Sequence, residues 1–420
     1  MRILGKTAFT AALAGVMGLG LTFGGAVTAH AATTTILSGA GSDTTYFMLA
    51  GSTKNTNGLD KAFNAGHATT KVTEIPPSNS TATGFPASVT VPADAACPKV
   101  APWNSNGSYT WDSHDAAHTP PNGSGAGITA LQNDDAGTHK GCLVDYARSS
   151  RALGSSTDTP DLQSFAFALD AVTWSSDNAA NHAAPTTLTT TQLTKIYTCF
   201  TSGVNVGKPQ ISNWSQVGGT SSTITKYAPQ TGSGTLSFFQ TKLLGGATVD
   251  AGCDATHLSH RAEENQLVTR CTNNDAACAQ GTQAIPAADY AHLITPFSYS
   301  KWHSQFNGSE PDLRHGATIK AVGGVLPSGT TIKEGTGHFI GTRYVYNILT
   351  TKEPHYAAAA AFAGINQTTK ANGWLCQDVS SSIHTQISNI IKAFGFTPLV
   401  DSVEGSGQPK GYCRFNPTPL

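Results

Sequence analysis

One local pattern occurs three times in this chain: a short β-prone run, a glycine-rich turn, then a run with helical spacing. The three turns are Ser38–Thr45, Pro121–Gly127 and Gln230–Thr235. Strands that alternate with helices predict an α/β fold with open, largely parallel sheets flanked by helices. This pattern limits the chain to a small set of layered architectures.

The three turns share the chemistry of an anion site. In open α/β sheets, ligands bind at the carboxyl ends of the strands, where such turns gather. Glycine lets the backbone approach a ligand closely, and the first turn of a helix offers unpaired N–H groups and partial positive charge. Serine and threonine hydroxyls add donors, so converging turns would hold an oxyanion with few cations. For each turn alone, a helix N-cap and a turn glycine remain the alternative interpretation.

Two further segments complete the expected organisation. The run Leu143–Ala147 is typical of a buried strand, and it ends in Arg148–Arg151. Segment 51–122 is rich in Pro, Ser, Thr, Asn and Gly, and we expect long loops with little regular structure there.

Residues 1–31 have the form of a signal peptide. Arg2 and Lys6 precede an apolar stretch, and Ala29-His30-Ala31 is a small-x-small cleavage site, so we expect cleavage after Ala31. An N-terminal membrane anchor is the alternative, but the apolar run is short and broken by glycines. No cysteine lies near the cleavage point, so we expect no lipid anchor. No later stretch is apolar enough to span a bilayer, and the sequence therefore predicts a secreted protein.

The cysteines fit an oxidising compartment. Their even number suggests four disulfides with undetermined pairing: Cys97, Cys142, Cys199, Cys253, Cys271, Cys278, Cys376 and Cys413. Cys271 and Cys278 are close enough for a local loop, and Cys376 with Cys413 would pin the C-terminal tail. A zinc site is the alternative, but the chain has no C-x-x-C pair.

Composition excludes one class of partner. The net charge is −1 and only 12% of residues are charged, so the basic surplus of a nucleic-acid-binding protein is missing. A mature chain of this length is too long for one ordinary core, and we expect two lobes.

Taken in order, these motifs resemble the phosphate-binding protein family of bacterial ABC transporters, over nearly the whole mature chain. Gly39–Phe47 looks like the family's G-A-G-x-T-F turn, and Gly123–Ile128 looks like its G-S-G-x-G-I turn. Val144–Ser150 is similar to its V-D-F-G-A-S-D run. Gly232–Thr235 matches its G-S-G-T turn, the most specific of the set, and Gly395–Leu399 resembles the closing G-Y-x-P-L. The short sequences GSDTT and ARSSR are similar to those of a branch of the family found in high-GC Gram-positive bacteria.

The resemblance implies a type 2 periplasmic-binding-protein fold, with two lobes that each contain a mixed, mostly parallel sheet. Lobe I would be residues 33–167 plus 294–420, and lobe II residues 168–293, with ligand closing the cleft by a hinge motion. It also implies a monomer without cofactor or metal, a small oxyanion as ligand (phosphate favoured) and an ABC permease as partner. Carried over residue by residue, the resemblance implies anion contacts from Thr44, Ser124, Ser150, Ser233, Gly234 and Thr235. We expect the neighbouring residues Ser42, Asp43, Gly125, Ser149 and Arg151 to belong to the same site.

Two family features are absent. The arginine that the family places three residues before the G-S-G-T turn is Pro229 here, and the aspartate that ends its V-D-F-G-A-S-D run is Ser150. The arginine would supply a charge-assisted contact, and the aspartate would accept the proton of a protonated phosphate. Arg148 or Arg151 could replace the charge and Asp43 the acceptor. Ion pairs and a helix N-cap are the equally open alternatives.

Two other classes of function remain in view. An extracellular hydrolase has little support, because the chain has neither a G-x-S-x-G elbow nor an H-E-x-x-H helix. His114 with His118 and Glu263 with Glu264 are the pairs that could serve a metal or acid–base chemistry, although surface positions explain both. A secreted surface or matrix protein that keeps the fold without binding solute is the main alternative.

Overall fold

A fifteen-residue strand, β6 (Leu162–Ser176), forms the centre of the main sheet, and every residue in it except Gln163 is buried. The computed structural model describes residues 34–77, 85–94, 108–112, 118–136, 143–176, 183–262, 269–270, 283–367, 369–378, 380–399 and 413–420. Within these residues, no helix has the length and apolar character needed to cross a bilayer.

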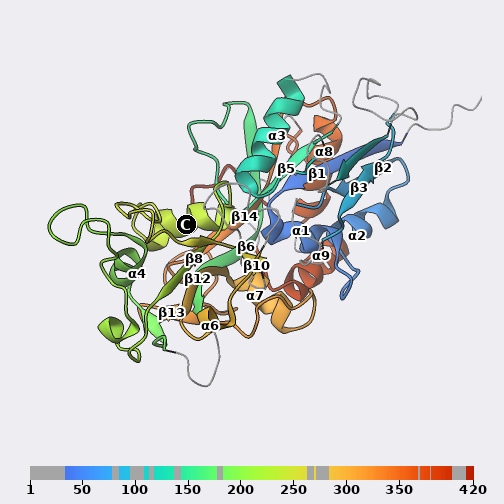
Figure 1. Cartoon of the computed structure of the whole chain (residues 1–420). Coiled ribbons are helices and arrows are strands. Elements are labelled where there is room, and N and C mark those ends of the chain that lie inside the picture. Colours follow the sequence, from blue (N-terminus) through green and yellow to red (C-terminus); the bar gives the residue numbers. More distant parts are fainter. Residues whose placement is uncertain are drawn as a thin grey trace, which may run out of the picture. The chain divides into compact units, whose positions relative to one another are not determined.

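The main sheet has parallel strands on both sides of an antiparallel centre (Figure 1). Its strand order is β2 (Thr70–Glu74), β1 (Thr35–Gly41), β5 (Tyr146–Ser149), β14 (Thr342–Thr350), β6, β12 (Leu293–Ser298), β8 (Thr225–Ala228) and β9 (His260–Arg261). The pairs β2–β1–β5 and β12–β8–β9 are parallel, whereas β14 and β12 run antiparallel to β6. The predicted α/β fold, with a mixed sheet flanked by helices, is confirmed.

Short strands extend the centre of this sheet, and two small hairpin-like pairs of strands lie outside it. β6 also pairs with β13 (Thr318–Val322), β15 (Thr397–Pro398) and β16 (Arg414–Phe415), and β13 pairs with β7 (Thr187–Leu188). These two small hairpin-like pairs are two-stranded antiparallel sheets: β3 (Ser88–Val91) with β4 (Tyr109–Asp112), and β10 (Thr269–Arg270) with β11 (Gln283–Ala284).

Helices pack on the sheet through their apolar residues. α3 (Ser124–Ala136) contacts β5 and β1, and buries Ile128 and Leu131 as the helical spacing predicts. α8 (Tyr356–Ala363) contacts β14 and β1, α7 (Tyr299–Phe306) contacts β6 and β12, and α9 (Ser382–Ala393) contacts β15. The remaining helical elements are α1 (Asp43–Ala50), α2 (Leu59–Gly66), α4 (Thr190–Tyr197), η2 (Trp214–Val217), α5 (Gly234–Phe238), η3 (Phe239–Leu243), α6 (Ala287–Tyr290) and η5 (Trp374–Cys376).

The expectation of little regular structure in 51–122 is wrong. α2 and β2 lie in this segment, and β2 is a parallel edge strand of the main sheet. Leu59 and Phe63, four residues apart, bury one face of α2, and Val72 is buried in β2. The apolar signal is short and surrounded by polar residues, but packing on β1 and α1 stabilises both elements.

Two disulfides lie within the described residues: Cys376–Cys413, as predicted, and Cys199–Cys253. The other four cysteines, the signal peptide and the pairs that involve His114, Glu263 and Glu264 lie outside the described residues. The predicted lobe boundaries fall inside β6 and β12, and the two-lobe division stays a prediction.

Candidate functional site

The first glycine turn joins β1 to α1 and packs against two other segments. Gly41 ends β1 with φ 117°, in the region that favours glycine. A Cβ atom there would lie 2.6 Å from the carbonyl oxygen of Arg148 and 3.1 Å from the Cα of Gly127. The amide of Ser42 donates to the same Arg148 carbonyl at 3.0 Å. Glycine at position 41 therefore lets the turn close on β5 and α3.

The second and third turns are also in backbone contact. The amide of Gly125, near the start of α3, donates to the carbonyl of Gly232 at 3.1 Å. A Cβ atom on Gly123, which has φ 91°, would lie 2.7 Å from that carbonyl oxygen. Segments more than a hundred residues apart in sequence thus form one cluster, as the resemblance implies.

Three predicted serines and one predicted glycine meet at the centre of this cluster. The Oγ atoms of Ser124 and Ser150 are 3.2 Å apart, and the Ser42 hydroxyl donates to Ser150 Oγ at 3.3 Å. The amide of Ser150 donates to Ser124 Oγ at 2.9 Å. A Cβ atom on Gly234 would lie 2.3 Å from Ser150 Oγ and 2.4 Å from Ser124 Oγ. All four residues are buried, and their hydroxyls can reorient to donate to an anion.

The first turn of α1 carries buried oxygen atoms that have no hydrogen-bond partner among the described residues. These atoms are Asp43 Oδ2, Thr44 Oγ1 and Thr45 Oγ1, and each residue is at most 3% exposed. Buried polar atoms are nearly always paired, so three such atoms side by side in the sequence need an explanation. A polar ligand at this helix start would supply their partners.

The environment of Asp43 favours the protonated form of its carboxyl group. Burial raises the pKa of its carboxyl above the ordinary value, while the nearby cations Lys301 and Arg343 pull that pKa down. Lys301 is itself fully buried, paired with Glu310, and lies 4.8 Å from the centre of the Phe47 ring. A carboxylate that is poorly solvated in this way favours a partner that can donate a proton to it.

Two arginines contact this cluster: Arg148, whose Nε donates to the Ser42 carbonyl at 3.3 Å, and Arg343, which the sequence analysis did not identify. Arg343 reaches two of the turns. Its guanidinium donates to Asp170 Oδ2 at 2.8 and 3.0 Å, to the Ser150 carbonyl at 3.2 Å and to Thr235 Oγ1 at 3.1 Å. The side chain is 2% exposed. The only signal in the sequence is an arginine near the start of an otherwise uncharged, strand-forming run, Thr342–Thr350.

Arg148 and Arg151 make ion pairs of their own. Both terminal nitrogens of Arg151 donate to Asp158, at 2.8 and 2.9 Å, and the Ser149 hydroxyl donates to the Arg151 carbonyl at 2.7 Å. Arg148 is completely buried and donates to Glu74 at 2.5 Å. Of the two interpretations left open for these arginines, the ion pairs are what the structure contains. Anion contacts of Ser149 and Arg151 stay a prediction.

The third turn combines a helix cap with unsatisfied polar atoms. Ser233 Oγ accepts from the Leu236 amide at 3.3 Å, so this serine is the N-cap of α5. Pro229 is buried at the end of β8. The next residue, Gln230, is 2% exposed, and in the described part of the chain neither polar atom of its side-chain amide has a hydrogen-bond partner. Gln230 is a second candidate that the sequence analysis did not single out.

A cavity of about 820 Å³ lies against the cluster. Gly125, Ser150, Ser233 and Arg343 form one part of its wall. Part of the cluster is therefore in contact with a space that a ligand can enter.

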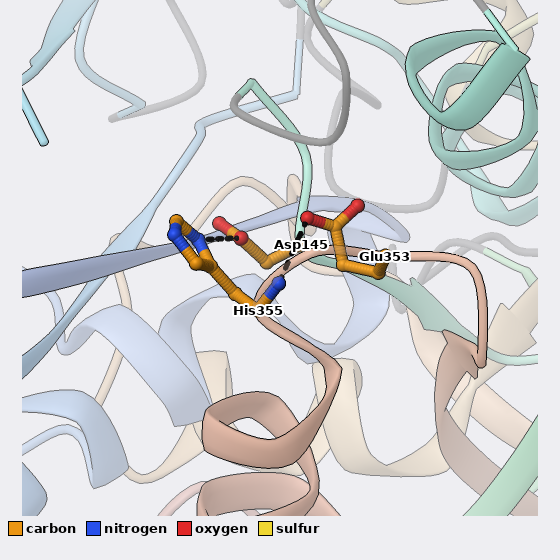
Figure 2. A group of neighbouring side chains, drawn as sticks. All are labelled: Asp145, Glu353 and His355. Atoms are coloured by element: carbon orange, nitrogen blue, oxygen red, sulfur yellow. Dashed lines mark hydrogen bonds and ion pairs between the residues drawn. The ribbon is translucent and has the colours of Figure 1, made fainter. Parts of the chain in front are cut away.

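A separate group of titratable residues, Asp145, Glu353 and His355, has the composition of a metal site (Figure 2). Nδ1 of His355 is 2.7 Å from Asp145 Oδ1, and the other oxygen of Asp145 accepts from the amide of Ser38 at 2.6 Å. The carboxylate is thus already bonded on both oxygens. We interpret the group as an ion cluster that ties β1 to the segments before β5 and α8.

Comparison with known proteins places this fold in a family. The family described as "PBP superfamily domain" matches residues 38–364, well over half of the chain. No curated protein sequence matches this chain.

Two solved structures illustrate the likeness. An ABC-type phosphate transport receptor from Vibrio cholerae is 17% identical, covering 86% of this chain and 99% of its own, with a TM-score of 0.46. A putative phosphate ABC transporter substrate-binding protein from Clostridium perfringens, solved with bound phosphate, is 14% identical, covering 86% and 98%, with a TM-score of 0.45. The family match over residues 38–364 is the decisive comparison, and by it the chain belongs to the PBP superfamily.

Proposed function

We propose that this chain is a secreted solute-binding protein that holds a small tetrahedral oxyanion, phosphate first among them. The observation that carries the proposal is the meeting of Ser42, Ser124, Ser150 and Gly234 beside the unpaired oxygens of Asp43 and Thr44. Membership of the PBP superfamily supports a binding role. The site would supply hydroxyl and amide donors to the anion.

In this proposal, two buried residues replace the features that the sequence lacks. Arg343 takes the place of the missing cation at Pro229, because its guanidinium already reaches Ser150 and Thr235. Asp43 takes the place of the acceptor lost at Ser150, since its raised pKa suits a partner that carries a proton. A protonated phosphate has such a proton, and a fully ionised sulfate has none.

The proposed role in transport follows from the resemblance to the phosphate-binding protein family. Two lobes would close on the anion by a hinge motion, and an ABC permease would receive it. The signal peptide would deliver a monomer outside the cytoplasm without a lipid anchor, and the proposal includes no catalytic step.

The test is calorimetry of the chain against phosphate and sulfate, with Ser150→Asp alongside. We expect heat with phosphate, and thermal stabilisation that grows as RT ln(1 + [L]/Kd). Ser150→Asp should raise the preference for phosphate over sulfate, and Ser156→Asp in the exposed loop nearby is the matched control. If no oxyanion binds at millimolar concentration, the proposal fails and a solute-free surface protein becomes the better interpretation.

A further inference from the structure

The cavity beside the serine cluster is much larger than an inorganic oxyanion requires. A tetrahedral oxyanion takes up the room of two or three water molecules, roughly 60–90 Å³ at ~30 Å³ each. The cavity has a volume of about 820 Å³. Spaces of about 300–1,000 Å³ are typical of sites for drug-sized organic ligands.

The wall of the cavity combines polar and apolar side chains. Ser150, Ser233 and Arg343 are among the polar residues that line it, and six aliphatic or aromatic residues line it as well: Leu153, Leu236, Phe238, Val249, Tyr344 and Tyr346. Apolar side chains do not stabilise an inorganic anion, because the anion is solvated better by water or by hydrogen-bond donors. They favour a ligand that also carries carbon surface.

The charges around the cavity limit how many phosphoryl groups such a ligand carries. Three arginines and Lys242 line the wall, and each arginine is paired with a carboxylate: Arg151 with Asp158, Arg261 with Asp250 and Arg343 with Asp170. The positive charge of the arginines is therefore largely compensated, and Lys242 adds a single further positive charge. A polyphosphate would need a larger surplus of positive charge.

We propose that the ligand is a phosphomonoester of about the size of a sugar phosphate. Its phosphoryl group lies at the serine cluster, and its organic group fills the cavity between Leu153 and α5. The inference rests on the oxyanion site proposed above and specifies its ligand class.

The experiment compares four ligands by calorimetry on the full chain: inorganic phosphate, glucose phosphate, phenyl phosphate and glucose. We expect one of the two esters to bind about tenfold more tightly than inorganic phosphate, and glucose alone to give no heat. Esters that bind no more tightly than inorganic phosphate would overturn the inference and leave the oxyanion site intact. If neither phosphate nor ester binds, the oxyanion site fails with it.

Two variants reduce the space without touching the serine cluster. Leu153→Trp and Ser237→Phe change half-buried wall residues, and Ser156→Trp is the control, an exposed neighbour that is not part of the wall. The two wall variants should lose the tenfold gain for the ester and keep the affinity for inorganic phosphate. Equal ester affinity in folded wall variants and control would contradict the assignment of the cavity.

Discussion

Gly234 and Ser150 are so close that a single methyl group on the glycine would lie 2.3 Å from the serine hydroxyl. That distance is far inside van der Waals contact, and Gly234 is buried at the start of α5. The two residues belong to different turns, so the contact fixes how closely β8 and β5 approach each other at the site.

Gly234→Ala should therefore weaken oxyanion binding by about tenfold or more, since the turn has to move away from Ser150 and Ser124. Calorimetry with phosphate is the measurement. Gly329→Ala is the matched control, because a methyl group there meets nothing within 4 Å. Unchanged affinity in a folded Gly234→Ala protein would show that this contact does not form part of the site.

Arg343→Met should both abolish oxyanion binding and destabilise the fold. The substitution leaves the buried carboxylate of Asp170 without its cation, and breaking a buried pair costs about 3–5 kcal/mol. Lys352→Met removes an exposed pair with Asp161 and should cost about 0–1 kcal/mol. Urea unfolding of both variants measures the difference, and equal costs would contradict a central role for Arg343.

Asp43→Asn should stabilise the free protein at neutral pH while it weakens phosphate binding. The pKa of Asp43 is raised in the folded state, so its contribution to stability is full below the unfolded value near 3.8 and is lost as the pH rises through the folded value. The amide replaces a carboxyl group whose charged form burial disfavours, so the free energy of unfolding should rise. Urea unfolding and phosphate calorimetry check both parts.

The anion selectivity of Asp43→Asn separates two explanations. An amide cannot take the proton of a bound phosphate, so phosphate affinity should fall while sulfate affinity holds or rises. A parallel loss for both anions would mean that Asp43 only shapes the turn.

His355 should make the free energy of unfolding depend on pH near neutrality. The hydrogen bond to Asp145 raises the pKa of His355 above 6.5, and the charge of Asp94 adds to that effect against the opposing cost of burial. The stability that protonated His355 contributes is full below pH 6.5 and is lost as the pH rises through its folded value.

Urea unfolding at about pH 6 and about pH 8 tests this dependence. The wild type should lose stability between the two conditions, and His355→Gln should lose less. Asp145 also has a raised pKa because of burial, but its ordinary pKa of 3.8 places the start of its own window at lower pH. His338→Gln, on an exposed loop, is the control, and an identical slope in all three proteins would contradict the prediction.

The sequence predicts the parts of the site that depend on local backbone geometry. Glycine turns before helices indicate where the chain bends, and Ser42, Ser124 and Gly234 do meet there. The contact between Arg343 and Asp170 was not predicted, because the two residues lie 173 positions apart, on strands whose sequences are typical of a buried core. Only the pairing of β14 with β6 brings them together, and no local pattern encodes that pairing.

The central strand β6 has a consequence for how this protein is made. Its partners include β14 and β16, so its hydrogen bonds wait for segments that are synthesised more than 150 residues later. Pairing between such distant segments is slow, and the unpaired strand is prone to aggregate meanwhile. Under the proposed export, β6 would complete its hydrogen bonds outside the cytoplasm. There, the disulfide between Cys376 and Cys413 would hold β16 near its partner.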